Sequence, residues 1–321
     1  MQSIESLRRL VEQELLSIKY PLQPVDLYMP IEYILSLGGK RMRPILMLLA
    51  HQLYNKDLQN AIKPSLAIEV FHNFTLVHDD IMDQAPVRRG KNTVHTKWNQ
   101  NVAILSGDAM LIQSYQYFSH LPENQLKQCL SIFNEMALQV CEGQQYDMDF
   151  EIKAEVDLNS YLKMIELKTA VLLGASLKIG ALIGGADEKD ANQLYEFGRN
   201  IGIAFQLKDD FLDTFGNADS FGKQQGGDII AKKKTCLYLK ALTLCEGEQK
   251  RELINLYNAD QINPTEKVQS VKAIFKSLEI ETHISYLINE YYDKAMSHLS
   301  TIQKDVSELE AFAFLLKKRE S

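Results

Sequence analysis

The sequence predicts an all-α protein, and three observations lead to this fold class. Residues 123–263 contain no proline, the strongest helix breaker, so long uninterrupted helices are expected there. From Tyr161 to Leu173, apolar residues recur at intervals of three and four, the period of a helix with one buried face. The alternation of apolar and polar residues that marks β-strands is nearly absent.

The expected elements follow from this periodicity in chain order. Helices are predicted near residues 3–18, 28–37, 42–54, 65–83, 95–119, 122–150, 158–183, 188–214 and 230–245, with several shorter ones to the end. Two predicted loops, 84–94 and 214–228, each follow a cluster of aspartates. The second loop holds four of the sixteen glycines, which predicts a mobile segment able to close over a ligand.

Composition narrows the class of protein. A chain of 321 residues can form one large domain or two fused helical layers, and because no change in composition marks a boundary, we predict a single domain over residues 1–321. A formal net charge of −7 argues against a nucleic-acid surface. No apolar run of about 18 residues occurs, so no membrane span is expected. The four cysteines form no CxxC pair, which argues against a disulfide framework or zinc site and favours a cytoplasmic location.

The pattern DDxxD occurs twice, at Asp79–Asp83 and Asp209–Asp213. On a helix, the first and last aspartates of each cluster lie about one turn apart, so their carboxylates project side by side. Such oxygen ligands suit Mg²⁺, which is usually held by one or two carboxylates together with substrate phosphates. The alternative is a solvated acidic helix face, but each cluster follows a markedly apolar segment, which a solvated face would lack.

Both clusters fall at the C-terminal ends of predicted helices. There the helix dipole disfavours a carboxylate by a few tenths to about 1 kcal/mol. Violations of local preference are expected at functional sites, and bound cations would offset this repulsion.

Basic residues occur where a phosphate ligand would need them. The segment GGKRMRP at 38–44 places three cations at a glycine-initiated turn into a helix, which suits a diphosphate, although such runs are more often solvated surfaces. Further cations follow the aspartate clusters: Arg88, Arg89, Lys223 and Lys233. Six aspartates and two diphosphates at about −3 each would be nearly balanced by three Mg²⁺ and about seven cationic side chains, so about three Mg²⁺ are expected per site.

These segments resemble the trans-isoprenyl (polyprenyl) diphosphate synthase family, and in particular its short-chain farnesyl and geranylgeranyl members. The similar segments run in family order: GGKRMRP at 38–44, FHNFTLVHDDIMDQAPVRRG at 71–90, SGDAML at 106–111, EGQQYDMD at 142–149, LKTA at 167–170, FQLKDDFLD at 205–213 and FGKQQGGDI at 221–229. The resemblance implies a large orthogonal helical bundle of the isoprenoid synthase type, usually a homodimer. It also implies that the two aspartate clusters face each other across a deep central cavity.

The resemblance assigns roles to matching positions. The principal magnesium ligands would be Asp79, Asp83 and Asp209, supported by Asp80, Asp210 and Asp213. Isopentenyl diphosphate would bind Lys40, Arg43, His72 and Arg89. The allylic diphosphate would bind Arg88, Lys168, Thr169, Gln206, Lys223 and Lys233. The match at Lys233 departs from the family pattern, because a run of lysines, 232–234, stands where the family usually has a glycine before the lysine.

The implied reaction adds isopentenyl diphosphate to dimethylallyl, geranyl or farnesyl diphosphate. Magnesium and the basic residues stabilise the departing diphosphate, an allylic carbocation forms, and the isopentenyl double bond attacks it. A proton then leaves to the released diphosphate, so no protein base is required.

Product length depends, in this family, on bulky residues upstream of the first cluster. Phe74 and Thr75 stand five and four residues before Asp79, which resembles synthases that stop at geranylgeranyl diphosphate, although farnesyl diphosphate also fits. An ideal helix turns Phe74 away from the Asp79 face. Either the helix is distorted, or Thr75 and Phe71 shape the tunnel floor, or Phe74 belongs to the ordinary core.

Three other functions remain as alternatives: a longer-chain polyprenyl diphosphate synthase, a class I terpene cyclase, and a noncatalytic synthase subunit. A second DDxxD cluster and the GGKRMRP segment argue against the cyclase. The noncatalytic subunit would be expected to lack one cluster or its basic partners, and both are present.

Overall fold

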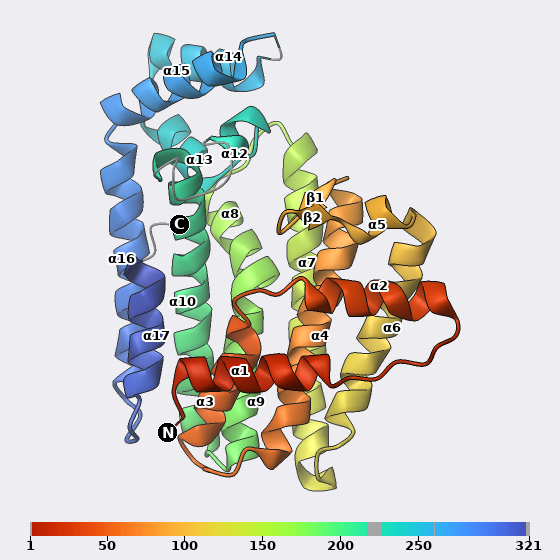
Figure 1. The fold of residues 1–321 in the computed structure, drawn as a ribbon. Coiled ribbons are helices and arrows are strands. Elements are labelled where there is room, and N and C mark those ends of the chain that lie inside the picture. Colours follow the sequence, from red (N-terminus) through yellow and green to blue (C-terminus); the bar gives the residue numbers. More distant parts are fainter. Residues whose placement is uncertain (1, 217–225, 260, 319–321) are drawn as a thin grey trace. The chain divides into compact units, whose positions relative to one another are not determined.

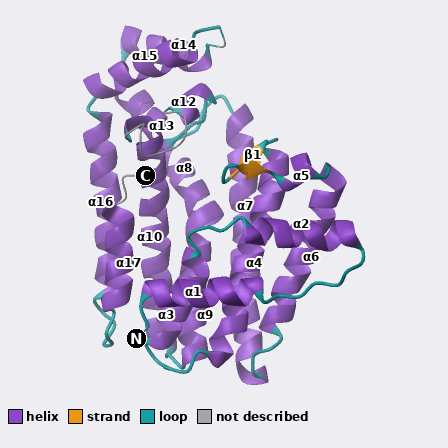
Figure 2. Ribbon diagram, in the orientation of Figure 1, coloured by secondary structure: helices purple, strands orange, loops and turns teal. Residues whose placement is uncertain are grey.

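The computed structural model describes residues 2–216, 226–259 and 261–318, and most of them are helical (Figure 2). The all-α prediction is therefore confirmed. The chain forms two compact units that interleave in sequence. Unit 1 comprises Met1–Glu135, Ala175–Tyr195 and Ile302–Leu309, and unit 2 comprises Met136–Gly174, Glu196–Thr301 and Glu310–Ser321. Each unit is described by itself below.

Unit 1 is built around one long helix, α4. Its elements are α1 (Ile4–Leu16), α2 (Val25–Ser36), α3 (Met42–Gln52), α4 (Gln59–Met82), the strands β1 (Val87–Arg88) and β2 (Lys91–Asn92), α5 (Val94–Lys97), α6 (Gln100–Phe118) and parts of α7, α9 and α10 (Figure 1). Helices α1, α2, α3 and α6 all pack against α4, most extensively α6. Residues 64–71 of α4 are consequently buried on every side, which explains why this stretch has no polar face.

Close helix packing in unit 1 depends on a glycine of α9 (Val171–Gly184). A Cβ atom at Gly180 would lie 2.1 Å from the carbonyl oxygen of Met47 in α3. Only glycine allows these two helices to approach so closely, because any side chain would collide with the backbone of α3.

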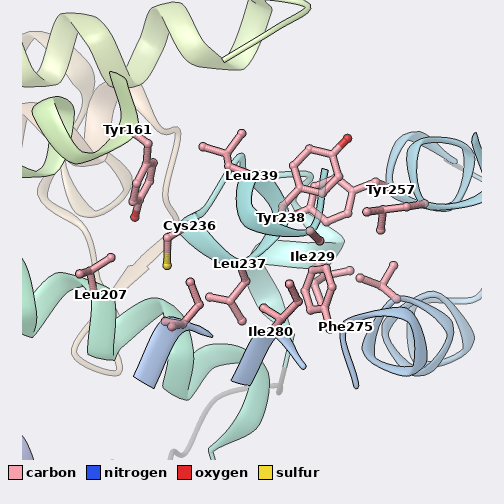
Figure 3. Packing of buried hydrophobic residues seen from close by; sticks show 14 of the residues in the cluster. Tyr161, Leu207, Ile229, Cys236, Leu237, Tyr238, Leu239, Tyr257, Phe275 and Ile280 are labelled. Atoms are coloured by element: carbon pink, nitrogen blue, oxygen red, sulfur yellow. The ribbon is translucent and has the colours of Figure 1, made fainter. Parts of the chain in front are cut away.

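Unit 2 has its own apolar core. Its elements are the rest of α7 (Glu123–Ile152), α8 (Leu158–Ile165), the π-helical turn η1 (Glu166–Ala170), the start of α9, the rest of α10 (Glu188–Phe215), α12 (Gly227–Ile230), α13 (Cys236–Leu244), α14 (Gly247–Asn258), α15 (Pro264–Ser277), α16 (Ile280–Leu299) and most of α17 (Ser307–Lys318). Side chains from α8, α10, α13, α14, α15 and α16 meet in this core (Figure 3). The rings of Tyr238 and Tyr257 stack there at 3.8 Å between centroids.

Several predicted helices are interrupted for local reasons. The predicted helix 95–119 is divided into α5 and α6, because the Asn99 side chain accepts a hydrogen bond from the Val102 amide and caps α6. The predicted helix 230–245 is shortened to α13, which begins only at Cys236, because α12 ends at Ile230 and Lys232 has a left-handed φ of 57°. The expectation of only shorter helices after residue 245 was wrong, since α16 has 20 residues.

One segment, Leu158–Gly184, is long and apolar enough to cross a membrane, with a mean hydropathy of 1.5 over its most apolar window. Within this window 72% of the residues are buried inside the protein. That burial is characteristic of a core helix, which satisfies the same criteria of length and composition as a membrane span.

Candidate active site

The first aspartate cluster occupies the C-terminal end of α4, as predicted. Asp79 and Asp80 lie in the last turn, and Asp83 is the C-cap residue. The Asp80 side chain is 1% exposed, whereas that of Asp79 is 18% exposed. The cluster therefore presents its first aspartate to the surface and directs its second inward.

Arg88 of β1 binds the buried aspartate. Its Nε donates to both carboxylate oxygens of Asp80 at 2.9 Å, and its Nη2 lies 2.7 Å from Asp80 Oδ1 and 3.5 Å from Asp79 Oδ2. Burial opposes the charge of Arg88, but Asp80 and the neighbouring carboxylates outweigh it and raise the pKa of Arg88. This pair fastens the β1–β2 hairpin to the end of α4.

A second group of cations gathers around His72 of α4. The Arg43 Nη1 lies 3.0 Å from His72 Nε2. Burial, reinforced by Arg43 and Arg89, lowers the pKa of His72 well below its usual value, so the ring is neutral and accepts this hydrogen bond. Burial also lowers the pKa of Arg43 to about 10, and Arg89 adds to this effect. The Arg43 Nε is buried without a hydrogen-bond partner among the described residues. An anion bound here would stabilise the buried charge of Arg43 and would accept a hydrogen bond from its Nε.

The hairpin brings Arg89 to the same place. Arg89 and Gly90 have φ values of 52° and 73°, which makes the tight turn between β1 and β2. The Arg89 Nη1 donates to the carbonyl oxygen of Gly38. A Cβ atom on Gly39 would lie 3.0 Å from the Arg89 guanidinium carbon, so this glycine leaves space for the cation. Three of the four residues predicted for isopentenyl diphosphate are thus held near one another, beside Lys40.

The second aspartate cluster lies in the last turns of α10, within unit 2. Asp210 is buried and accepts hydrogen bonds from the Tyr161 hydroxyl, from Gln206 Nε2 at 3.3 Å and from the Cys236 amide at 3.4 Å. Tyr161 and Cys236 are both labelled in Figure 3. Burial raises the pKa of Asp210 to about 6, although these hydrogen bonds act against the rise. As in the first cluster, the second aspartate is directed inward and fixed by neighbouring elements.

The third aspartate of this cluster joins α10 to α12. Asp213 Oδ2 accepts a hydrogen bond from the Asp228 amide at 3.0 Å, and the Asp213 carbonyl accepts one from the Gly226 amide at 2.8 Å. These bonds hold the two described ends of the glycine-rich loop together. Most of that loop, residues 217–225 with the predicted ligand Lys223, lies outside the described residues.

Lys168 and Thr169 lie in the π-helical turn η1. Such turns are rare and occur frequently at functional sites. The Lys168 Nζ lies 2.6 Å from Asp147 Oδ2 on α7. A Cβ atom at Gly143 of α7 would lie only 2.2 Å from the Lys168 amide nitrogen, so α7 supports the turn directly through a glycine. The helix predicted over 158–183 contains this irregularity, which its periodicity does not indicate.

Neighbouring lysines in the run at 232–234 make different contacts. The Lys234 Nζ donates to the carbonyl oxygens of Phe150 at 2.5 Å and Lys153 at 2.6 Å, near the C-terminal end of α7. The Tyr257 hydroxyl donates to the Lys233 carbonyl oxygen. The Lys233 amide also donates to the Asp228 carbonyl oxygen at 2.9 Å, so the backbone of Lys233 is held at both its amide and its carbonyl.

The donor atoms near the aspartate clusters suit a hard cation. They are carboxylate oxygens at the ends of two helices, as Mg²⁺ prefers. Among the described residues no three His, Cys, Asp or Glu side chains converge to form a complete metal site.

Phe74 and Thr75 lie in a regular stretch of α4, so the helix is not distorted there. The Phe74 ring contacts the rings of Phe71 at 5.6 Å and His78 at 4.8 Å. The Thr75 hydroxyl donates to the His72 carbonyl within the helix. Phe74 thus lies on the His78 side of α4, and its role in product length stays a prediction.

A family model described as polyprenyl synthetase matches residues 24–278. The chain belongs to the polyprenyl synthetase family. A crystal structure of geranylgeranyl pyrophosphate synthase is 42% identical and superposes with a TM-score of 0.94, covering 100% of both chains. The isoprenoid synthase type of bundle is therefore confirmed.

Two curated relatives are similar in sequence to this polyprenyl synthetase. Geranylgeranyl diphosphate synthase from Methanosarcina mazei is 40% identical over 221 residues, 68% of each chain. Geranylfarnesyl diphosphate synthase from Natronomonas pharaonis is 36% identical over 253 residues, 73% of this chain and 74% of the relative. The predicted enzyme class, a prenyltransferase, is confirmed by the family.

Several residues that shape the site of this polyprenyl synthetase were not predicted. Tyr161 binds Asp210, Asp147 pairs with Lys168, and Glu69 pairs with Arg41 of the basic segment. Asp147 lies within the EGQQYDMD segment, so its motif was visible in the sequence although its partner was not. Tyr161 and Glu69 sit in ordinary helical patterns, and only their contacts reveal them.

Proposed function

We propose that this polyprenyl synthetase is a short-chain trans-prenyl diphosphate synthase. It adds isopentenyl diphosphate to an allylic diphosphate, namely dimethylallyl, geranyl or farnesyl diphosphate. The supporting observation is the group of cations in unit 1. Arg43, paired with a neutral His72, has a pKa lowered to about 10 and a buried Nε without a partner among the described residues. Such a group binds an anion rather than another protein carboxylate.

Two sets of residues are proposed to bind the two substrates. Lys40, Arg43, His72 and Arg89 hold the diphosphate of isopentenyl diphosphate. The allylic diphosphate binds Arg88, Lys168, Thr169, Gln206, Lys223 and Lys233. The guanidinium and ammonium groups among them stabilise the negative charge that develops as the allylic diphosphate departs.

Mg²⁺ is proposed as the metal, with about three ions per site. Asp79, Asp83, Asp209 and Asp213 are its proposed ligands, because they lie at the C-terminal ends of α4 and α10 and none of the four is buried. Bound magnesium would neutralise charge on the leaving diphosphate. The contacts of Asp80 with Arg88 and of Asp210 with Tyr161 support a positioning role for these two aspartates, beside the ligand role that the resemblance gives them.

The proposal includes a single domain over residues 1–321 and a cytoplasmic location. The interleaving of the two units along the chain supports the single domain, because neither unit is a continuous segment that could be separated at one boundary.

A homodimer is also proposed, and unit 1 offers a face for it. Leu105 and Ile112 of α6 are each 60% exposed and lie two helical turns apart on one side of the helix. Tyr115 continues this apolar stripe. Exposed apolar surface of this kind is characteristic of an interface. Light scattering of the wild type and of Ile112→Glu tests it, since a dimer through this face would dissociate in the variant.

Geranylgeranyl diphosphate is the proposed product, followed by farnesyl diphosphate. The geranylgeranyl synthases among the relatives support it. A longer product is the second candidate, because a geranylfarnesyl synthase is 36% identical to this chain.

The decisive experiment incubates the purified protein with labelled isopentenyl diphosphate, Mg²⁺ and each allylic primer in turn, and sizes the products by chromatography. Product formation should stop in EDTA and resume on addition of Mg²⁺. Asp79→Asn and Asp209→Asn should each lower kcat by at least about 10²-fold. Undiminished turnover in EDTA, or in both variants, would contradict the proposal.

A further inference from the structure

Arg41 lies in the basic segment at 38–44, yet its guanidinium is buried against α2 and α4. Its side chain is buried, and its Nη1 lies 2.6 Å from Glu69 Oε1 on α4. Its Nη2 donates to the carbonyl oxygen of Leu35, near the C-terminal end of α2, at 2.6 Å. The expectation that all three cations of this segment suit a diphosphate is therefore wrong for Arg41, because both of its Nη atoms are already bound, although its Nε is buried without a hydrogen-bond partner among the described residues.

Two features of Arg41 are energetically unfavourable. A buried ion pair gains little over an apolar pair of the same shape, because both charges lose their water. Arg41 also has a φ of 49°, in the left-handed region that a residue with a side chain seldom adopts. Stability alone explains neither feature. Together they indicate that the turn must have one particular shape.

The shape of this turn matters because two residues proposed to bind the diphosphate, Lys40 and Arg43, lie next to it. Lys40 precedes Arg41 in the chain, and Arg43 follows two residues later, in the first turn of α3. The guanidinium of Arg41 thus joins the turn to α2 and to α4 at once. On α4, the carboxylate of Glu69 also accepts a hydrogen bond from Asn73 Nδ2 at 3.1 Å, which fixes its orientation.

The same helix supplies the histidine of the cation group. His72 is three residues beyond Glu69 and adjacent to Asn73, and it accepts the hydrogen bond of Arg43 at 3.0 Å. Any displacement of the turn relative to Glu69 would therefore change the distance between Arg43 and His72. Arg89 also depends on the turn, because its guanidinium donates to the Gly38 carbonyl.

We propose that Arg41 and Glu69 form a positioning pair, which holds Lys40, Arg43 and Arg89 in place for the diphosphate of isopentenyl diphosphate without touching it. A lysine cannot replace Arg41, because one ammonium lacks the planar fork that bonds Glu69 and Leu35 together. This inference rests on the proposed function, since it refines one of the two diphosphate sites.

The test measures KM for isopentenyl diphosphate, KM for the allylic primer, and Tm, in the full-length protein. The variants are Arg41→Lys, Glu69→Gln, Arg41→Met and the double variant Arg41→Met/Glu69→Leu. We expect each to raise KM for isopentenyl diphosphate by about tenfold or more, and KM for the primer by less than about twofold. The double variant should recover the Tm lost in Arg41→Met, because no unpaired charge stays buried, but not the KM.

A matched control is Tyr54→Phe, which removes a partly buried contact of unit 1, the hydrogen bond to Asp190 Oδ2 at 2.8 Å. It should lower Tm without changing the ratio of the two KM values. If KM recovers whenever Tm does, or if both KM values rise together, the pair is merely structural and the inference is overturned.

Titration calorimetry with inorganic diphosphate gives a readout that does not need turnover. Arg41→Met should bind it about tenfold more weakly than Tyr54→Phe, and equal affinities would overturn the inference. A wild-type protein that binds diphosphate but forms no product with any primer would refute the proposed function alone, and these affinities would then decide the positioning role.

Discussion

Substituting Gly143 by alanine should displace the turn that carries Lys168 and Thr169. The new Cβ atom would lie 2.2 Å from the Lys168 amide nitrogen and 2.7 Å from the Leu167 carbonyl carbon, whereas ordinary contacts begin near 3.4 Å. The obstructing atoms are backbone, so η1 and α7 must separate by about 1 Å. Overpacking of this kind destabilises a protein by about 1–3 kcal/mol. A misplacement of about 1 Å in a binding group can cost about 10²-fold in rate.

The assay compares kcat and both KM values of Gly143→Ala with those of the wild type. Because Lys168 and Thr169 are proposed to bind the allylic diphosphate, KM for the primer should rise about tenfold or more, and KM for isopentenyl diphosphate should change little.

Gly184→Ala is the control for stability. Its Cβ atom would lie 2.7 Å from the carbonyl oxygen of His51, so the variant is also overpacked, but in unit 1 and away from η1. It should lower Tm without a selective effect on the primer. The reasoning would be refuted if Gly143→Ala kept a wild-type KM for the primer, or if both glycine variants gave the same kinetic pattern.

Three further predictions concern other parts of the chain. Phe74→Ala should lengthen the main product by at least one isoprene unit, as measured by chromatography, and an unchanged length would remove Phe74 from the tunnel floor. Lys234→Met should raise KM for the primer several-fold, because the carbonyls of Phe150 and Lys153 lose their donor and the residue next to Lys233 is no longer tied to α7; unchanged kinetics would show that the backbone needs no such support. Burial lowers the pKa of His51, so unfolding takes up a proton and stability falls as the pH drops below about 6.5, by at most about 1.4 kcal/mol per pH unit. His51→Gln should make urea-unfolding free energies less dependent on pH between 7.5 and 5.5, and an equally steep dependence in the variant would exclude His51 as the cause.

Local sequence patterns predicted most of the elements, because helix periodicity and the absence of proline act within a few turns of the chain. The positions of both aspartate clusters at helix ends were also predicted correctly. Local patterns did not reveal the π-helical turn at residues 166–170, since its irregularity depends on the close approach of Gly143 from a distant helix. Nor did they reveal the non-helical residues 231–235, which include the left-handed Lys232, at the start of a predicted helix.

The sequence by itself determined the fold class, the family and the types of side chain available for metal and phosphate, because these depend on residue identity and spacing along the chain. Tertiary structure alone decided which members of each motif face a ligand. Arg41 and Arg43 look alike in the sequence, yet one is bound to Glu69 and the other to His72. Asp79 and Asp80 are adjacent, yet only Asp80 is fully buried against Arg88. The physical reason is that burial and pairing are set by residues distant in the chain, which no local pattern contains.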